Sequence, residues 1–118
     1  MIQRGREGEE AAVRYLEEHN CRICRRNYRC KYGEIDIIAY DKLENYLLIV
    51  EVKNRIDNRN GAPCEAVDFR KQRKICMTFN YYRMEQSLPE DTNIRFDVME
   101  CYDAAHIHWI KNAFEYVL

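Results

Sequence analysis

Two acidic residues and a lysine carry the strongest chemical signal in the sequence. Glu51 and Lys53 stand two residues apart at the end of an apolar run that begins at Leu47, so both would leave one face of a buried strand. Burying a charge is costly unless the charge is paired or bound to a metal ion. If the segment around Asp36 pairs antiparallel with this run through the polar loop 41–45, Asp36 lies opposite Val50 or Glu51.

Two carboxylates placed side by side repel each other unless a cation lies between them. Mg²⁺ and Mn²⁺ prefer oxygen ligands, and they typically take one or two carboxylates together with waters and phosphate oxygens. With Lys53 beside them, Asp36 and Glu51 would form a set suited to phosphodiester hydrolysis, in which the ammonium positions water or neutralises the phosphate. The alternative is structural: the three side chains pair with one another at an exposed strand end.

The spacing of apolar residues predicts an α/β fold in which helices and strands follow one another as helix, three strands, helix and two strands. Alternation of apolar and polar residues changes its parity after Val98, which predicts a β-bulge there. A polar loop is expected over 54–63. The expected segments are helix 7–19, strands 21–29 (short and polar), 34–40 and 46–53, helix 67–84, and strands 94–101 and 106–110.

The acidic strings are similar to the Asp and Glu-x-Lys core of the PD-(D/E)XK nuclease superfamily. More closely, the whole chain resembles the YraN family, bacterial proteins related by fold to archaeal Holliday-junction resolvases. The segments that carry this resemblance are Gly5-x-x-Gly8-Glu9, Arg26-Asn27-x-Arg29, Gly33-Glu34-Ile35-Asp36, Val50-Glu51-Val52-Lys53, Gly61-x-Pro63, Val67-x-x-x-Lys71, Arg95-Phe96-Asp97-Val98 and Asn112-Ala113-Phe114. They extend over nearly all of the chain.

The resemblance implies a restriction-endonuclease-like α-β-β-β-α-β core with a mixed central sheet flanked by helices. It implies that Asp36 and Glu51 bind Mg²⁺ or Mn²⁺ with the backbone carbonyl of Val52, and that Lys53 is the catalytic lysine. Glu9 matches an additional acidic ligand of resolvase-like relatives, with Glu10 as the alternative. The implied activity is an endonuclease acting on DNA, branched or single-stranded, and by analogy a homodimer.

The chain departs from the superfamily at Ile35, where the superfamily name has proline, a position that varies widely. It also has no clear Gln-x-x-x-Tyr motif of the kind found in RecB-type nucleases, although Gln72 falls in the second predicted helix. That absence weakens an exonuclease reading.

Basic residues gather near the predicted site. Residues 20–31 hold five basic side chains and no acidic one, and a second cluster opens the helix 67–84. A nucleic-acid backbone is the natural partner of such clusters, although each alone could be a solvated face. The predicted DNA contacts are Arg25, Arg26, Arg29, Arg55, Lys71 and Lys74. Tyr28, Tyr32 and Tyr40 would either stack on unpaired bases or lie half-buried in strands.

Composition is compatible with these expectations. The 118 residues suit a single domain spanning 1–118, and the net charge of −1 conceals an uneven distribution. Residues 1–74 carry sixteen basic and thirteen acidic side chains, a net charge of +3, and the remainder carries −4. No signal peptide or membrane span is evident, so a cytoplasmic protein whose six cysteines stay reduced is expected.

Two further readings stay open at this point. Cys21-x-x-Cys24 could hold zinc, but no second pair follows at ligand spacing. The rival to an endonuclease is a non-catalytic nucleic-acid-binding accessory module of DNA recombination or repair, which would keep the fold without the chemistry.

Overall fold

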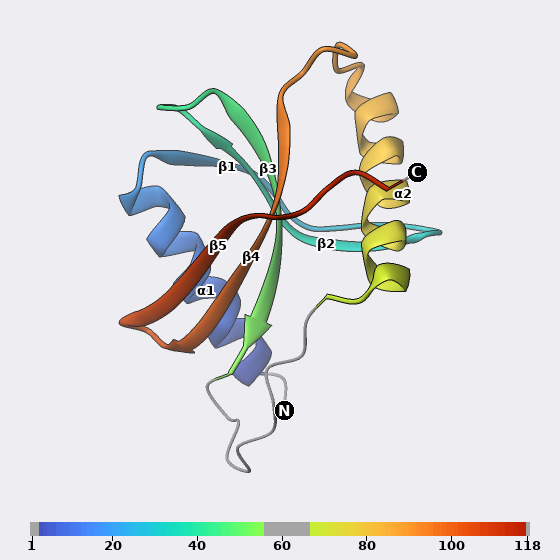
Figure 1. The fold of residues 1–118 in the computed structure, drawn as a ribbon. Helices are drawn as coiled ribbons and strands as arrows, with labels where there is room; N and C mark the ends of the chain where they lie inside the picture. Colours follow the sequence, from blue (N-terminus) through green and yellow to red (C-terminus); the bar gives the residue numbers. More distant parts are fainter. Residues whose placement is uncertain (1–2, 56–66, 118) are drawn as a thin grey trace.

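A computed structural model describes residues 3–55 and 67–117 of the chain (Figure 1). The elements follow the predicted order of one helix, three strands, one helix and two strands. Their bounds are α1 (Gln3–Glu18), β1 (Cys21–Cys30), β2 (Gly33–Asp41), β3 (Tyr46–Asn54), α2 (Phe69–Gln86), β4 (Ile94–Asp103) and β5 (His106–Phe114).

The strands form one mixed sheet in the order β1-β2-β3-β4-β5. β1, β2 and β3 are antiparallel neighbours, β3 and β4 run parallel, and β5 returns antiparallel to β4. The parallel pair requires a crossover connection, which contains α2. The two helices cover opposite faces of the sheet (Figure 1). The predicted restriction-endonuclease-like core, a mixed sheet flanked by helices, is therefore confirmed.

Each helix buries one apolar face against the sheet. On one side, Ala12 and Leu16 of α1 pack with Leu48 and Met99. The α2 side is built around Phe79, which packs with other buried residues of that helix and of the strands beneath it. Asp68 caps the start of α2 by accepting the backbone N–H of Lys71, at 2.8 Å.

Two strands differ from the sequence-based expectation. β1 extends one residue beyond the predicted 21–29, and a register shift between Ile23 and Arg25 bends it. β5 extends to Phe114 rather than ending at residue 110, because the β4–β5 ladder shifts register between Phe96 and Val98 and resumes at Phe114.

The predicted bulge near Val98 is thus confirmed in place, but the extra residues belong to β5, where Asn112 has a φ of 54°. The reason inferred from the sequence was wrong. β4 is buried on both faces from Arg95 to Cys101, so no change of face is needed to bury its apolar residues.

The predicted loop 54–63 lies mostly outside the described residues, and so does the Gly61-x-Pro63 string. In the part of the chain that the structure describes, neither helix has the length and apolar character needed to cross a membrane.

Candidate active site

Asp36 lies where the β2–β3 ladder ends. The last pair of that ladder joins Ile37 to Val50, so the same register continued by one residue sets Asp36 opposite Glu51. Instead of continuing the backbone ladder, the Asp36 carboxylate accepts the backbone N–H of Val52 at 2.8 Å. The sequence-based prediction that Asp36 faces Val50 or Glu51 across the hairpin agrees with this register.

The environment of Asp36 disfavours its charge. Burial raises the pKa of Asp36 to about 7, and the charges of Glu51, Glu9 and Glu34 act in the same direction. The hydrogen bond from Val52 stabilises the carboxylate and lowers the pKa, but it does not compensate for the other effects. A cation at this position would relieve that repulsion.

Glu51 has two lysines around it. Its side chain is only 9% exposed, and its Oε2 lies 3.8 Å from Lys53 Nζ and 3.2 Å from Lys71 Nζ. Lys53 comes from the same strand, whereas Lys71 reaches across from the first turn of α2. Burial disfavours the Lys71 ammonium, but the Glu51 carboxylate outweighs burial and raises the pKa of Lys71. Lys71, predicted to contact DNA, therefore lies within the acidic site.

Glu9 approaches from the other side of the sheet on α1. Gly8 makes this approach possible, because a Cβ there would lie 3.0 Å from the Cβ of Asn54 on β3. Arg26 on β1 holds the acidic turn of the helix: its Nη2 lies 2.9 Å from Glu10 and 3.8 Å from Glu9. The Gly8-Glu9 string thus has a packing reason, since a larger side chain at position 8 would crowd the Asn54 side chain at the strand end.

The donor set fits a hard divalent cation in part. Asp36 and Glu51 supply carboxylate oxygens beside the backbone of Val52, which is the kind of set that Mg²⁺ accepts when waters complete its shell. Over residues 3–55 and 67–117, however, no three His, Cys, Asp or Glu side chains are grouped to hold one ion. Glu9 influences Asp36 electrostatically without joining it and Glu51 in a three-ligand group, and Cys21-x-x-Cys24 likewise belongs to no such group.

The three arginines of β1 that were predicted to contact DNA interact instead with acidic side chains or with an aromatic ring of the protein. Arg29 Nε lies 3.4 Å from Glu34, Arg26 is held by α1 as described, and the Arg25 guanidinium lies 5.1 Å from the centre of the Tyr28 ring. Tyr28 itself is buried and donates to Glu85 at 2.6 Å, so its ring is not available for stacking on a base.

The remaining predicted contacts divide into two kinds. Arg55 pairs with Glu100, with 3.6 Å between Nη2 and Oε2. Lys74 lies on the exposed side of α2, next to the turn between β1 and β2, and has no ion pair among the described residues. Lys74 therefore differs from Arg26, Arg29 and Arg55, each of which has an acidic partner within the protein.

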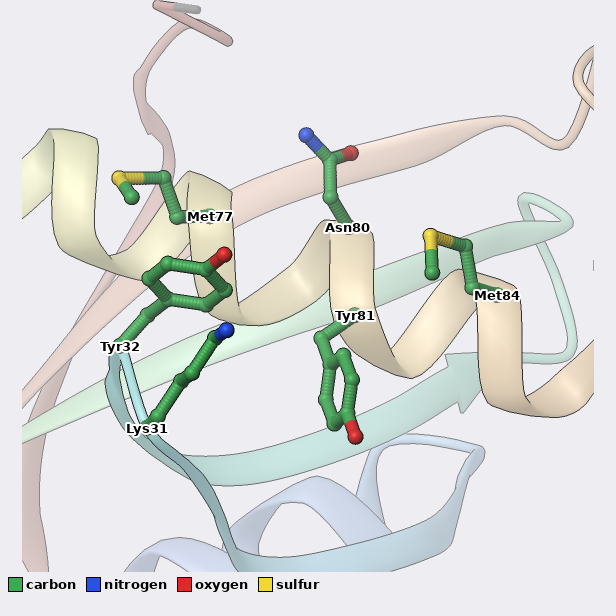
Figure 2. Close-up of a pocket in the computed structure, with 6 residues that line it drawn as sticks. All are labelled: Lys31, Tyr32, Met77, Asn80, Tyr81 and Met84. Carbon is green, nitrogen blue, oxygen red and sulfur yellow. The ribbon is translucent and has the colours of Figure 1, made fainter.

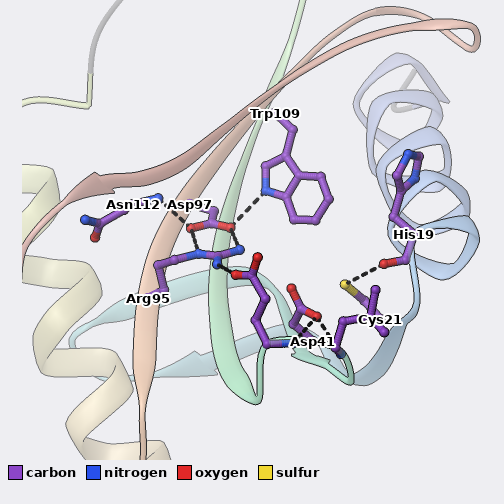
Figure 3. Close-up of polar contacts among 9 residues, drawn as sticks. His19, Cys21, Asp41, Arg95, Asp97, Trp109 and Asn112 are labelled. Carbon is purple, nitrogen blue, oxygen red and sulfur yellow. Dashed lines mark hydrogen bonds and ion pairs between the residues drawn. The ribbon is translucent and has the colours of Figure 1, made fainter.

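No physical role for Asp97 could be inferred from the residue pattern, and the structure supplies one (Figure 3). Asp97 is fully buried and accepts four hydrogen bonds: two from Arg95 at 2.9 Å, one from the Trp109 indole at 2.8 Å, and one from the backbone N–H of Asn112 at 2.9 Å. Arg95 also donates to Glu44 at 3.0 Å. This network fixes the irregular part of β5 and the β2–β3 turn to β4. The alternating Arg95 and Asp97 were its only sequence signal.

Comparison with known proteins places the chain among relatives of the same length. A family model described as "Uncharacterised protein family UPF0102" matches residues 8–101, a span that includes Glu9, Asp36, Glu51, Lys71 and Asp97. The chain belongs to the UPF0102 family. The YraN resemblance is thereby confirmed, since this is the same family.

Individual members of UPF0102 match the chain almost from end to end. A UPF0102 protein of Clostridioides difficile is 45% identical over 113 residues, covering 95% of this chain and 96% of the relative. One from Lachnoclostridium phytofermentans is 46% identical over 107 residues, covering 91% and 88%. One from Clostridium acetobutylicum is 44% identical over 113 residues, covering 92% and 90%. The residues that form the fold and the site described above therefore lie in the part of the chain that aligns with these relatives.

Proposed function

We propose that this UPF0102 protein is a metal-dependent endonuclease that hydrolyses phosphodiester bonds in DNA, branched or single-stranded. The observation that carries the proposal is the pair Asp36 and Glu51, held at the end of a buried strand pair with too little positive charge around Asp36. A protein gains nothing in stability from such repulsion, and strongly perturbed carboxylates are typical of functional sites.

In this proposal, the acidic residues bind the metal ion and the lysine acts on the water or the phosphate. Asp36 and Glu51, with the carbonyl of Val52, would hold Mg²⁺ or Mn²⁺, which when bound lowers the pKa of water and stabilises charge on the phosphate. Lys53 lies beside Glu51 and is in a position to orient the attacking water or to donate a hydrogen bond to a phosphate oxygen. Glu9 adds negative charge that strengthens binding of the cation.

One observation favours the rival function, a nucleic-acid-binding accessory module. The Lys71 ammonium lies 3.2 Å from Glu51, where it compensates part of the acidic charge without any metal ion. In an accessory module this ion pair would be permanent. In a nuclease, binding of the cation would displace Lys71 from Glu51 and release it toward the substrate phosphate.

The nuclease proposal is tested by cleavage. Purified protein is incubated with 5′-labelled linear, flapped and four-way-junction DNA and with a single strand, in Mn²⁺ and in EDTA. We expect Mn²⁺-dependent products whose yield falls at least about a hundredfold in Asp36→Asn and in Lys53→Met, because each substitution removes part of the charge stabilisation of the transition state. Lys42→Met, in the β2–β3 turn, is the matched control and should cleave like the wild type. Equal cleavage by all four proteins would point to a contaminant and overturn the proposal.

Metal binding separates the two functions directly. Calorimetric titration with Mn²⁺ at pH 8 should show one site in the wild type and none in Asp36→Asn. At pH 5.5 the apparent affinity should fall about tenfold or more, because Asp36, with its pKa of about 7, must lose a proton when the ion binds. A wild-type protein that binds DNA but takes up no Mn²⁺ at millimolar concentration would establish the accessory function instead.

A further inference from the structure

The outward face of α2 is hollowed along its length. One hollow of about 350 Å³ lies between this helix and the turn joining β1 to β2, and a second of about 440 Å³ lies over the first half of the helix. Both hollows are lined by Met77, so they adjoin along the helix, and together they are named here the α2 groove. The first is lined by Lys31, Tyr32, Met77, Asn80, Tyr81 and Met84 (Figure 2), and the second by Phe69, Arg70, Arg73, Lys74 and Met77.

Large apolar side chains are exposed in this groove and do not belong to the hydrophobic core. Phe69 is 59% exposed, Met84 71%, and Tyr32 and Tyr81 are each 38% exposed. The residues of α2 that pack on the sheet, such as Phe79, lie on the opposite side of the helix. α2 is therefore apolar on two faces, and only one of these faces is accounted for by the fold.

The groove has positive charge and no acidic lining residue. Four of its ten lining residues are basic, and none is aspartate or glutamate. Within the described parts of the chain, Arg70, Arg73 and Lys74 form no ion pair, in contrast to Arg26, Arg29 and Lys71. The Lys31 ammonium lies 5.3 Å from the centre of the Tyr32 ring, so charge and aromatic surface are presented together.

We propose that the α2 groove binds a single strand of nucleic acid, with bases stacked on Tyr32, Tyr81 and Phe69 and phosphates held by Lys31, Arg70, Arg73 and Lys74. Aromatic rings among basic side chains form the usual platform for single strands, because every unpaired base offers a face for stacking. A duplex hides those faces. An acidic or apolar protein segment would match either the charges or the rings, but a nucleic-acid strand matches both.

The groove also leads toward the acidic site. From Phe69 to Met84 the helix rises roughly 22 Å at about 1.5 Å per residue. Near its start, Lys71, which does not line the groove, reaches Glu51 at 3.2 Å, so a strand that leaves the groove at Phe69 would lie within about one helical turn of the acidic site. The inference thus rests on the proposed function and deepens it, because it specifies DNA that has a single-stranded arm as the substrate.

Binding is measured by fluorescence anisotropy with a labelled 20-nucleotide oligothymidine, in EDTA so that no cleavage occurs. We expect Tyr81→Ala and Tyr32→Ala each to weaken binding at least about fivefold, the lower end of the effect of losing one stacked base. Tyr81→Phe should bind like the wild type, because it keeps the ring. Leu43→Ala is the matched control: Leu43 is 70% exposed in the β2–β3 turn, at the other end of β3 from the acidic site.

Salt dependence tests the phosphate contacts. With four cations in the groove, the slope of log K against log salt should be about −3, and Arg73→Ala should reduce its magnitude by about 0.7. Lys42→Ala, which removes an exposed charge from the β2–β3 turn, should leave the slope unchanged. Equal affinities for all variants, or a duplex of equal length bound as tightly as the single strand, would overturn the inference.

Two outcomes distinguish this inference from the proposed function. If the groove variants lose binding in EDTA while the wild type shows no cleavage in Mn²⁺, the groove assignment stands and the nuclease assignment fails. If the wild type cleaves DNA and the groove variants bind and cleave normally, the groove assignment fails alone. A wild-type protein that sediments as a dimer, while Met84→Glu sediments as a monomer without loss of DNA binding, would show that a second copy covers the groove and would also overturn the inference.

Discussion

Two aspartates, the fully buried Asp97 and the half-buried Asp36, lie on strands of the same sheet and have opposite surroundings. Asp97 on β4 accepts four hydrogen bonds, two of them from the guanidinium of Arg95, so its charge is fully compensated. Asp36 on β2 accepts one hydrogen bond among the described residues, from the Val52 backbone N–H, and faces the charges of Glu51, Glu9 and Glu34. Burial raises the pKa of Asp36 to about 7.

The difference distinguishes a carboxylate that holds the fold from one that is available for chemistry. A buried charge with complete partners stabilises one arrangement of strands, and removing either partner leaves the other exposed to an apolar interior. A buried charge with incomplete partners costs stability, and that cost is retained where a ligand later compensates it. The three predictions below test this distinction, beginning with the largest effect.

Asp97→Ala should destabilise the protein strongly. The substitution leaves Arg95 buried without its main partner and frees the Trp109 indole and the Asn112 N–H from their acceptor. We expect the free energy of unfolding to fall by about 3–5 kcal/mol. Urea unfolding followed by circular dichroism measures it.

Should Asp97→Ala fail to fold, Asp97→Asn replaces it. The amide keeps one acceptor oxygen, so the free energy of unfolding should fall in the same direction but by less. Glu44→Ala is the matched control, since it removes the more exposed partner of Arg95 and should cost less than about 1 kcal/mol. A loss of similar size in Asp97→Ala and Glu44→Ala would contradict the idea that Asp97 holds the fold.

Asp36→Asn should stabilise the protein at pH 8, in EDTA. The aspartate pKa is near 3.9 in the unfolded chain and about 7 in the folded protein, so between these values the folded state binds more protons. Stability contributed by this group therefore falls as pH rises from about 4 to 7. We expect a gain in the variant on the order of 2–3 kcal/mol at pH 8, because an amide carries no charge and can still accept the Val52 N–H.

The same comparison at low pH provides the control. At pH 4, where Asp36 is protonated in the folded wild type, the gain from Asp36→Asn should vanish. Urea midpoints at pH 4, 6 and 8 give the profile, and taking the difference between variant and wild type removes the titration of all other groups. A variant that is less stable than the wild type at pH 8 would show that Asp36, like Asp97, holds the fold.

The sequence predicted the acidic site better than its surroundings because the site depends on local features. Apolar runs locate β2 and β3, the short connection between them fixes their register, and register alone brings Asp36 next to Glu51. Lys71 was predicted from the basic cluster and from the family resemblance as a DNA contact, not as a partner of Glu51. Its contact with Glu51 depends on how α2 packs on the sheet. More than a dozen residues connect β3 to α2, so the local sequence pattern does not determine that packing.

Two other features were hidden for different reasons. The partners of Asp97 come from β5 at the point where its register shifts, and a pattern of alternation does not reveal such a shift. The basic residues at the start of α2 were visible in the sequence, but the α2 groove was hidden because its apolar residues, among them Phe69 and Met84, could equally have packed in the core. In each case the missing information was the arrangement of elements, not the type of residue.

The smallest expected effect on stability is that of replacing Lys71, which compensates part of the charge of Glu51. Its side chain is 46% exposed, so its ion pair with Glu51 contributes less than about 1 kcal/mol to stability, and Lys71→Met should unfold in urea almost like the wild type. Its effect on metal binding should be opposite in sign. The ammonium competes with a divalent ion for Glu51, so Lys71→Met should bind Mn²⁺ several-fold more tightly, whereas Lys74→Met, three residues along the helix, should not. Weaker Mn²⁺ binding in Lys71→Met would mean that the lysine supports the cation site, and the charge around Asp36 and Glu51 would then be compensated within the protein, as it is around Asp97.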